Sequence, residues 1–175
     1  MMLLVGLAAV LILLFGFVVF RGAPYVPSKR RELDRMFVDL YRPSHNDLLL
    51  DLGSGDGVVL RSASRHGVRA VGYELNPLLV WVSRWLSKKD DRVSVELVDI
   101  WRALFPDDTT VVYVFAESRD IRRLTKKIEE EANRLKRGLW VISFGFRLPG
   151  YEAKRTYRAY YLYRVDPLQR DKPQV

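Results

Sequence analysis

Three glycines stand at alternate positions in residues 51–57 (DLGSGDG), directly after the apolar residues 48–50. Glycine permits positive φ angles and a close approach of the backbone to another molecule. At a strand-to-helix junction, Gly53, Gly55 and Gly57 would lie beside the free N–H groups of a helix N-terminus, which bind polar or anionic ligands. A turn that needs only flexibility is the alternative, and one glycine alone would favour it. The repeated spacing favours a ligand site.

The glycine spacing differs from that of a dinucleotide site. The dinucleotide fingerprint is G-x-G-x-x-G, whereas here the third glycine comes one residue early and Val58 holds the expected position. Asp51, at the start of the motif, would gain nothing beside a pyrophosphate. A ligand with a cationic amino group would gain from this carboxylate, because opposite charges attract.

Two further carboxylates, Glu74 and Asp99, come at the ends of the next two apolar segments. Ligands of open α/β sheets bind beyond the carboxyl ends of the strands, where these residues and the glycines are all expected. Glu74 is then placed to accept hydrogen bonds from both ribose hydroxyls of an adenosine, and Asp99 to accept one from the adenine amino group. Each alone is equally well a surface carboxylate. Together they describe S-adenosylmethionine lying across the edge of the sheet.

Alternating strand and helix patterns position these residues. Strands are predicted at residues 47–52, 68–75, 93–100, 110–117 and 139–146, and helices at residues 29–42, 58–66, 76–89 and 118–136. Residues 156–165 alternate aromatic and polar side chains and predict one last antiparallel strand. The pattern predicts a doubly wound, Rossmann-like α/β domain. Trp81 and Trp85 are interpreted as packing residues of their helix, and residues 128–137 (IEEEANRLKR) as a solvated helix face.

Residues 1–20 contain no charged side chain and predict a transmembrane anchor, since about 20 helical residues span the roughly 30 Å of a bilayer core. A cleavable signal peptide is the alternative, but it has a basic start, a shorter apolar core and a small-residue cleavage site, none of which is present. Basic residues accumulate just after the apolar run, which predicts a single-pass protein with its domain on the cytoplasmic, or equivalent inner, side. The expected organisation is an anchor at residues 1–20, a linker at 21–28 and a cofactor-binding domain at 29–175.

Composition narrows the classes of partner. The chain has no cysteine and two histidines, which argues against a disulfide scaffold and against a metal site. The net charge of +8 is spread along the sequence rather than gathered in one block, so nucleic acid is not expected. Attraction to the headgroups of the lipid bilayer is the simpler account of this charge. The oligomeric state is left open.

Several of these motifs resemble those of known enzymes. The segments DLGSGDG, GYELNP and VDIW are similar to the cofactor motifs of class I S-adenosylmethionine-dependent methyltransferases. The segment PYVPS after an apolar helix, followed by DLGSGDG and AVGYELNPLLVWVSRW, more narrowly resembles the membrane-anchored protein-lysine methyltransferase family that modifies the adenine nucleotide translocase and the ATP synthase c-subunit in mitochondria. The match extends over residues 25–101 and weakens afterwards.

The resemblance implies a role for each matching residue. Asp51 and the three glycines would surround the methionine part of the cofactor, with Glu74 at the ribose and Asp99 at the adenine. The implied contacts also include Ser54, Asn76 and Ile100, and Tyr25 and Pro27 in a segment that folds over the cofactor. The fourth strand departs from the family pattern, because VFAES replaces the usual Asn/Asp-Pro-Pro-Tyr. Glu117, aided by Tyr25, is our candidate for accepting the lysine proton, and a helix cap or ion-pair partner is the alternative for Glu117.

The resemblance implies S-adenosylmethionine-dependent N-methylation of a lysine on a membrane protein. Two alternatives remain at this point: methylation of a lipid or quinone at the membrane surface, and a catalytically silent cofactor-binding module. The sequence also leaves open whether the membrane is prokaryotic or mitochondrial.

Overall fold

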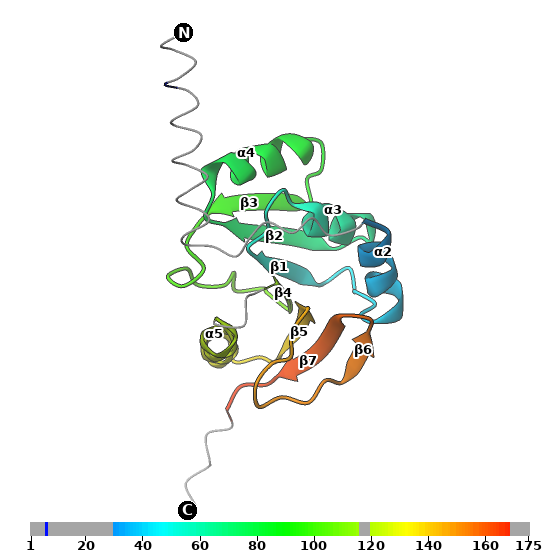
Figure 1. Cartoon of the computed structure of the whole chain (residues 1–175), viewed down its shortest axis with the longest axis vertical. Coiled ribbons are helices and arrows are strands. Elements are labelled where there is room, and N and C mark those ends of the chain that lie inside the picture. The colour runs from blue at the N-terminus through cyan, green and yellow to red at the C-terminus, as the bar shows by residue number, and fades with distance from the viewer. Residues whose placement is uncertain (1–5, 7–29, 116–119, 169–175) are drawn as a thin grey trace, which may run out of the picture.

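The computed structural model describes residue 6, residues 30–115 and residues 120–168 (Figure 1). Its helices are α2 (Arg30–Asp39), α3 (Val58–Arg65), α4 (Pro77–Leu86) and α5 (Ile121–Leu135). Its strands are β1 (Leu48–Leu52), β2 (Arg69–Glu74), β3 (Val93–Leu97), β4 (Val111–Phe115), β5 (Leu139–Phe144), β6 (Arg155–Tyr157) and β7 (Tyr160–Val165).

The strands form one mixed sheet in the order β3-β2-β1-β4-β5-β7-β6. The pairs from β3 to β5 are parallel, and β7 and β6 are added antiparallel at one edge. The order reverses between β1 and β4, which is where such sheets bind ligands. The predicted Rossmann-like α/β fold is confirmed.

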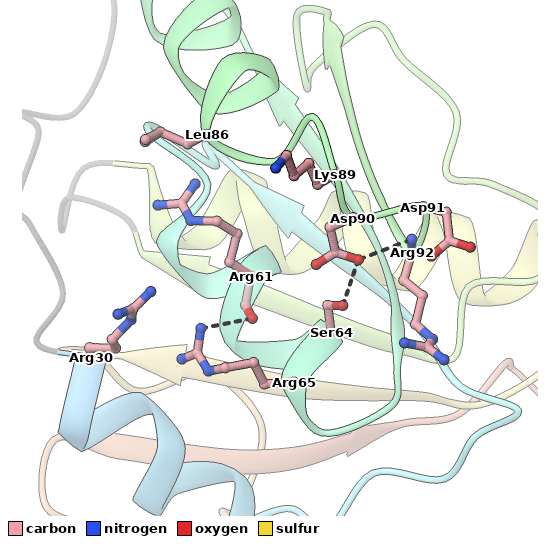
Figure 2. A pocket seen from close by; sticks show the side chains of 9 residues that line it. All are labelled: Arg30, Arg61, Ser64, Arg65, Leu86, Lys89, Asp90, Asp91 and Arg92. Carbon is pink, nitrogen blue, oxygen red and sulfur yellow. Dashed lines mark hydrogen bonds between the residues drawn. The ribbon is translucent and has the colours of Figure 1, made fainter.

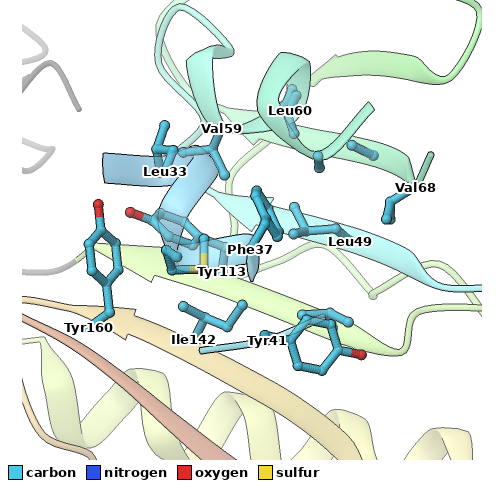
Figure 3. Packing of buried hydrophobic residues seen from close by; sticks show 14 of the residues in the cluster. Leu33, Phe37, Tyr41, Leu49, Val59, Leu60, Val68, Tyr113, Ile142 and Tyr160 are labelled. Carbon is cyan, nitrogen blue, oxygen red and sulfur yellow. The ribbon is translucent and has the colours of Figure 1, made fainter. Parts of the chain in front are cut away.

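Helices cover both faces of the sheet. Leu33 and Phe37 of α2 pack with Leu60 of α3 against one face, which also holds Val80 of α4 (Figure 3). The apolar side of α5, with Ile128 at its centre, covers the other face. Because β1 is buried along its whole length, it carries a nearly continuous apolar run, as a central parallel strand requires.

The prediction of a single last strand over residues 156–165 is wrong, since a β6–β7 hairpin stands in its place. Tyr157 pairs with Tyr160, so Arg158 and Ala159 alone make the turn, with Arg158 at φ 54°. Two-residue hairpin turns usually carry Asn-Gly or Asp-Gly. The Arg158-Ala159 turn lacks that signal. The alternating aromatic pattern of residues 156–165 therefore gave no indication that a turn divides it.

Two interpretations of helical side chains are also wrong. Trp81 and Trp85 are 64% and 56% exposed, because α4 packs on the sheet through Val80 and Ser83 on its other side. Glu131, in the supposedly solvated face of residues 128–137, is 2% exposed. It accepts hydrogen bonds from Lys127, Arg134 and the Phe105 amide at 2.9, 2.8 and 3.1 Å. These bonds fasten the loop after β3 to α5.

Replacing Glu131 by glutamine is expected to lower the free energy of unfolding by about 1–3 kcal/mol at neutral pH, because buried charge-assisted hydrogen bonds are lost. Burial alone raises the pKa of Glu131, but the bonds from Lys127 and Arg134 outweigh it and hold this pKa below its ordinary value. A lowered pKa stabilises the fold above the unfolded-state pKa, and this stabilisation is lost as the pH falls through the folded-state pKa. Urea unfolding should therefore separate the two proteins at pH 7. The difference should begin to shrink near the unfolded-state pKa of about 4 and vanish once the pH is below the lower folded-state pKa. Glu130→Gln, at a side chain 60% exposed, is the control, and an equal loss in both variants would contradict the prediction.

Apart from residue 6, the predicted anchor at residues 1–20 and linker at residues 21–28 lie outside the described residues. Among the helices that the structure describes, none is long and apolar enough to cross a membrane.

Candidate functional site

The glycine loop after β1 lies at the carboxyl edge of the sheet. Gly53, Gly55 and Gly57 have φ angles of 90°, 54° and 77°, in the left-handed region that favours glycine. The amides of Gly53 and Ser54 both donate to the Tyr73 carbonyl of β2, at 2.8 and 3.0 Å. The loop is therefore held against β2 in a conformation that its glycines permit.

The first and third glycines face different surroundings. A Cβ atom on Gly53 would meet no atom of the described residues within 4 Å, so these residues leave room for a ligand beside this part of the backbone. A Cβ atom on Gly57 would lie 2.1 Å from the Ser83 Oγ of α4. Gly57 is thus needed where α3 begins against α4, a packing reason that the sequence did not reveal.

Replacing Gly57 by alanine is expected to lower the free energy of unfolding by about 2–4 kcal/mol, because the left-handed conformation and the clash with Ser83 both oppose a side chain. Gly53→Ala is the matched comparison, since it adds the same methyl group at a positive φ but into open space. Gly53→Ala should lower the free energy of unfolding by only about 1–2 kcal/mol. Its main effect should be on ligand binding. Chemical unfolding of both variants checks this order, and a larger loss at Gly53 would contradict it.

Glu74 is fixed at the end of β2 by two backbone amides. Its Oε2 accepts from the Gly55 N–H at 2.9 Å and its Oε1 from the Asn76 N–H at 2.8 Å, and the residue is 9% exposed. Asn76 caps α4, because its Oδ1 accepts from the Leu78 N–H at 2.9 Å. The structure thus joins Glu74 to the glycine loop, and each carboxylate oxygen keeps a lone pair for a further donor.

Asp51 is a buried carboxylate in an acidic neighbourhood. It is 3% exposed, and no hydrogen-bond or ion-pair partner of its carboxylate is present among residues 30–115 and 120–168. Burial, followed by the charges of Glu74 and Asp56, raises the pKa of Asp51 well above its ordinary value. A buried carboxylate without a partner is costly unless a donor or cation approaches it. The site therefore fits a ligand with a cationic amino group.

Two polar residues of the glycine loop, Ser54 and Asp56, have different surroundings. The Ser54 side chain packs against β2, because its Oγ lies 2.5 Å from where a Cβ atom on Gly72 would stand. This Oγ is buried and finds no hydrogen-bond partner in the part of the chain that the structure describes. Asp56 instead accepts from the Val58 N–H at 3.1 Å and pairs with Arg61 at 3.4 Å.

Asp99 lies in the loop after β3, because this strand ends at Leu97 rather than at residue 100 as predicted. The Val98 N–H donates to the Glu74 carbonyl at 3.0 Å, which keeps the start of this loop beside β2. Asp99 accepts from the Trp101 N–H at 3.0 Å, and both Asp99 and Ile100 are half-buried. Their roles as cofactor contacts stay predictions.

The candidate residues Tyr25, Pro27 and Glu117 fall outside the described residues, so their roles also stay predictions. Within the described residues, no three side chains of His, Cys, Asp or Glu gather in a way that could hold a metal ion.

Sequence reasoning missed an aromatic row along the same edge of the sheet. Phe115, Phe144 and Tyr160 occupy paired positions on β4, β5 and β7. Their ring centroids are 5.8 and 4.6 Å apart, and the two phenylalanines are half-buried. The available signal was an aromatic residue near the end of two predicted strands, Phe115 in residues 110–117 and Phe144 in residues 139–146. This row gives the edge beyond β4 an apolar wall.

Comparisons with known proteins agree with this arrangement. The family model of the ANTKMT methyltransferase domain matches residues 51–155. The ATP synthase c-subunit lysine N-methyltransferase of Rattus norvegicus is 34% identical over 136 residues, which are 76% of this chain and 60% of that protein. A protein-lysine N-methyltransferase of Saccharolobus islandicus is 28% identical over 138 residues, 76% of this chain and 83% of that protein.

A solved structure is similar in fold. The RNA methyltransferase of Salinibacter ruber, in complex with S-adenosyl-L-homocysteine, has a TM-score of 0.71 and 29% identity over 84% of this chain and 98% of its own. The chain spans about half to three fifths of the length of the first curated relatives it matches. The match to the family model extends over more than half of the sequence, and the chain therefore belongs to the ANTKMT methyltransferase domain family.

Proposed function

We propose that this protein is an S-adenosylmethionine-dependent methyltransferase that N-methylates a lysine of an integral membrane protein. Residues 1–20 anchor it in the membrane, with the domain on the cytoplasmic or equivalent inner side. The observation that carries the proposal is the presence of two carboxylates, Asp51 and Glu74, at the same edge of the sheet, where ligands are expected. Asp51 is buried without a partner among the described residues, and Glu74 is held by the amides of Gly55 and Asn76.

The residues present fit S-adenosylmethionine. Asp51 offers its buried charge to the amino group of the methionine part, beside the open space at Gly53. Glu74 offers its remaining lone pairs to the ribose hydroxyls, and Asp99 is the candidate for the adenine amino group. When bound, the cofactor would supply an electrophilic methyl group on its sulfonium sulfur, and its thioether would be the leaving group.

The protein's own part in methyl transfer is to position and desolvate the acceptor. The aromatic row of Phe115, Phe144 and Tyr160 provides an apolar wall for the aliphatic part of a lysine side chain. Such a lysine must be neutral to act as a nucleophile, and Glu117, aided by Tyr25, is proposed to accept its proton directly or through water. Water exclusion along the aromatic row favours the neutral amine, because burial lowers a lysine pKa.

The names of the relatives support the lysine acceptor. Two are named for lysine methylation of the ATP synthase c-subunit and of adenine nucleotide translocase, and the relative from Saccharolobus islandicus for protein-lysine methylation. The membrane location of the acceptor and the anchor are our extension from these names and from the apolar residues 1–20.

The decisive experiment is transfer of a labelled methyl group from S-adenosylmethionine to isolated membranes and, separately, to RNA. RNA is included because the protein of the similar solved structure is named as an RNA methyltransferase. We expect label in protein, recovered as methyl-lysine after acid hydrolysis, and mass spectrometry then identifies the acceptor. Label that extracts with lipid or quinone, or that enters RNA, would overturn the lysine assignment. Cofactor binding without any transfer would indicate a silent module.

A further inference from the structure

One side of α4 presents apolar side chains to solvent. Leu78, Trp81 and Trp85 are 37%, 64% and 56% exposed and follow one another at spacings of three and four, so they share one side of the helix. Exposed apolar patches with a polar rim mark interaction sites. Tryptophan in particular is enriched at the interface between a membrane and water.

A basic hollow lies next to this side of α4. It has a volume of about 500 Å³, and its lining includes five cationic side chains from α2, α3 and the α4–β3 connection, namely Arg30, Arg61, Arg65, Lys89 and Arg92 (Figure 2). Arg61 and Arg65 pair with aspartates at 3.4 and 2.8 Å. For Arg30, Lys89 and Arg92, no acidic partner is present in the described part of the chain. The hollow therefore carries uncompensated positive charge.

The two aspartates in the lining leave this charge in excess. Asp90 accepts from the Ser64 hydroxyl at 2.8 Å and from the Arg92 N–H at 3.2 Å, so it is engaged within the fold. Both bonds come from uncharged donors, so Asp90 keeps its negative charge, and Asp91 is exposed to solvent. The three cations without an acidic partner therefore outnumber the two aspartates of the lining by one. The hollow thus suits an anionic group such as a phosphate.

The apolar side of α4 and the hollow form one continuous surface. Leu86, which directly follows Trp85, lines the hollow together with Lys89 and is 43% exposed. The Lys88 Nζ lies 5.7 Å from the centre of the Trp85 ring. We call the surface made by Leu78, Trp81, Trp85 and the basic hollow the α4 face.

The start of the described chain places this surface near the proposed bilayer. Arg30, in the lining of the hollow, is the first residue of α2. Ten residues lead from the end of the proposed anchor to Arg30, and an extended chain advances about 3.3–3.6 Å per residue. The hollow is therefore within roughly 35 Å of the membrane surface.

We propose that the α4 face docks on anionic phospholipid headgroups. Phosphates enter the hollow beside Arg30, Lys89 and Arg92, and Trp81 and Trp85 lie at the boundary of headgroups and acyl chains. The inference rests on the proposed anchoring for the position of the bilayer. Docking also orients the active edge, because α4 starts at Pro77, directly after Asn76, whose amide donates to the Glu74 carboxylate.

Quenching of tryptophan fluorescence by lipids with brominated acyl chains tests the docking. The full chain is reconstituted in vesicles of phosphatidylcholine alone or with added phosphatidylglycerol, without cofactor or acceptor. We expect stronger quenching with the anionic lipid, and loss of that difference in the double variant Trp81→Phe and Trp85→Phe. Trp140→Phe should keep it, because Trp140 is a half-buried residue of β5 outside the α4 face.

Charge variants test the hollow separately. Each basic side chain near an anionic membrane contributes on the order of a fivefold factor to binding. Lys89→Glu with Arg92→Glu should therefore lower the ratio of docked to undocked protein by about 25-fold or more. The same charge change at Arg122 and Lys126, on α5 across the sheet, should leave it unchanged.

The outcomes separate docking from anchoring, since resistance to carbonate extraction reports the anchor alone. Anchored protein whose tryptophans are quenched equally in both vesicles would overturn the docking while leaving the anchor intact. Equal quenching in both kinds of vesicle is also the result expected if residues 1–29 or a second copy of the chain cover α4 in place of lipid. Anionic-lipid-dependent quenching in protein that carbonate releases would support docking and contradict the anchor.

Discussion

Asp51→Asn is expected to weaken S-adenosylmethionine binding by about 5- to 150-fold while stabilising the protein without ligand. The loss of affinity follows from removing the charge that we propose faces the cofactor amino group. The gain in stability follows because Asp51 is buried, lacks a partner among the described residues and lies near Glu74 and Asp56. Removing the charge should add about 1–2 kcal/mol to the free energy of unfolding and raise the melting temperature by about 2–8 °C.

The pH dependence of the native protein follows from the same residue. A pKa raised in the folded state contributes stability below the unfolded-state pKa of about 4, and this contribution is lost as the pH rises through the folded-state pKa. Asp51 therefore destabilises the unliganded fold at neutral pH. Cofactor binding should tighten as the pH rises through the same pKa, because only the carboxylate attracts the amino group.

Calorimetric titration and thermal unfolding of both proteins measure the two effects. Asp108→Asn is the control, since Asp108 is an exposed ion-pair partner of Arg69, and its loss should change stability by less than about 0.5 kcal/mol. Unaltered affinity in both Asp51→Asn and Glu74→Gln would sink the assignment of the cofactor site. A preference for NAD would replace it.

The fold and the gathering of the site were predictable because both depend on local patterns. The sheet follows from alternating apolar strands and amphipathic helices. The meeting of Asp51 and Glu74 follows from the rule that parallel strands end at one edge. The hydrogen bond between Glu74 and Gly55 at 2.9 Å is consistent with this reasoning.

What the sequence could not show depends on contacts between distant residues or on missing turn signals. The need for Gly57 comes from Ser83, which is on another helix. The exposure of Trp81 was hidden because α4 is apolar on both sides, so periodicity does not tell which side faces the sheet. Glu131 was assigned to solvent by its charge, although its helical position is on the buried side of α5.

Removal of residues 1–20 is expected to slow methylation of a membrane-embedded acceptor by roughly 10²- to 10⁴-fold, the range in which tethering raises effective concentration. The rate on a short soluble peptide with the same lysine should not change. The physical reason is the short connection between the proposed anchor and the domain. Residues 21–29 reach about 30 Å at full extension, so an anchored site samples only a thin layer above the bilayer.

The matched control replaces residues 1–20 by an unrelated apolar helix of equal length. It should restore the rate on the membrane acceptor, since the effect comes from tethering and not from contacts of the anchor. The α4 face predicts a second difference between these proteins. Without the anchor, Lys89→Glu with Arg92→Glu should slow the residual reaction on anionic membranes further, because headgroup binding is then the sole attachment. An unchanged rate on the membrane acceptor after removal of residues 1–20 would show that the acceptor reaches the site without tethering, and the tethering role proposed for these residues would be wrong.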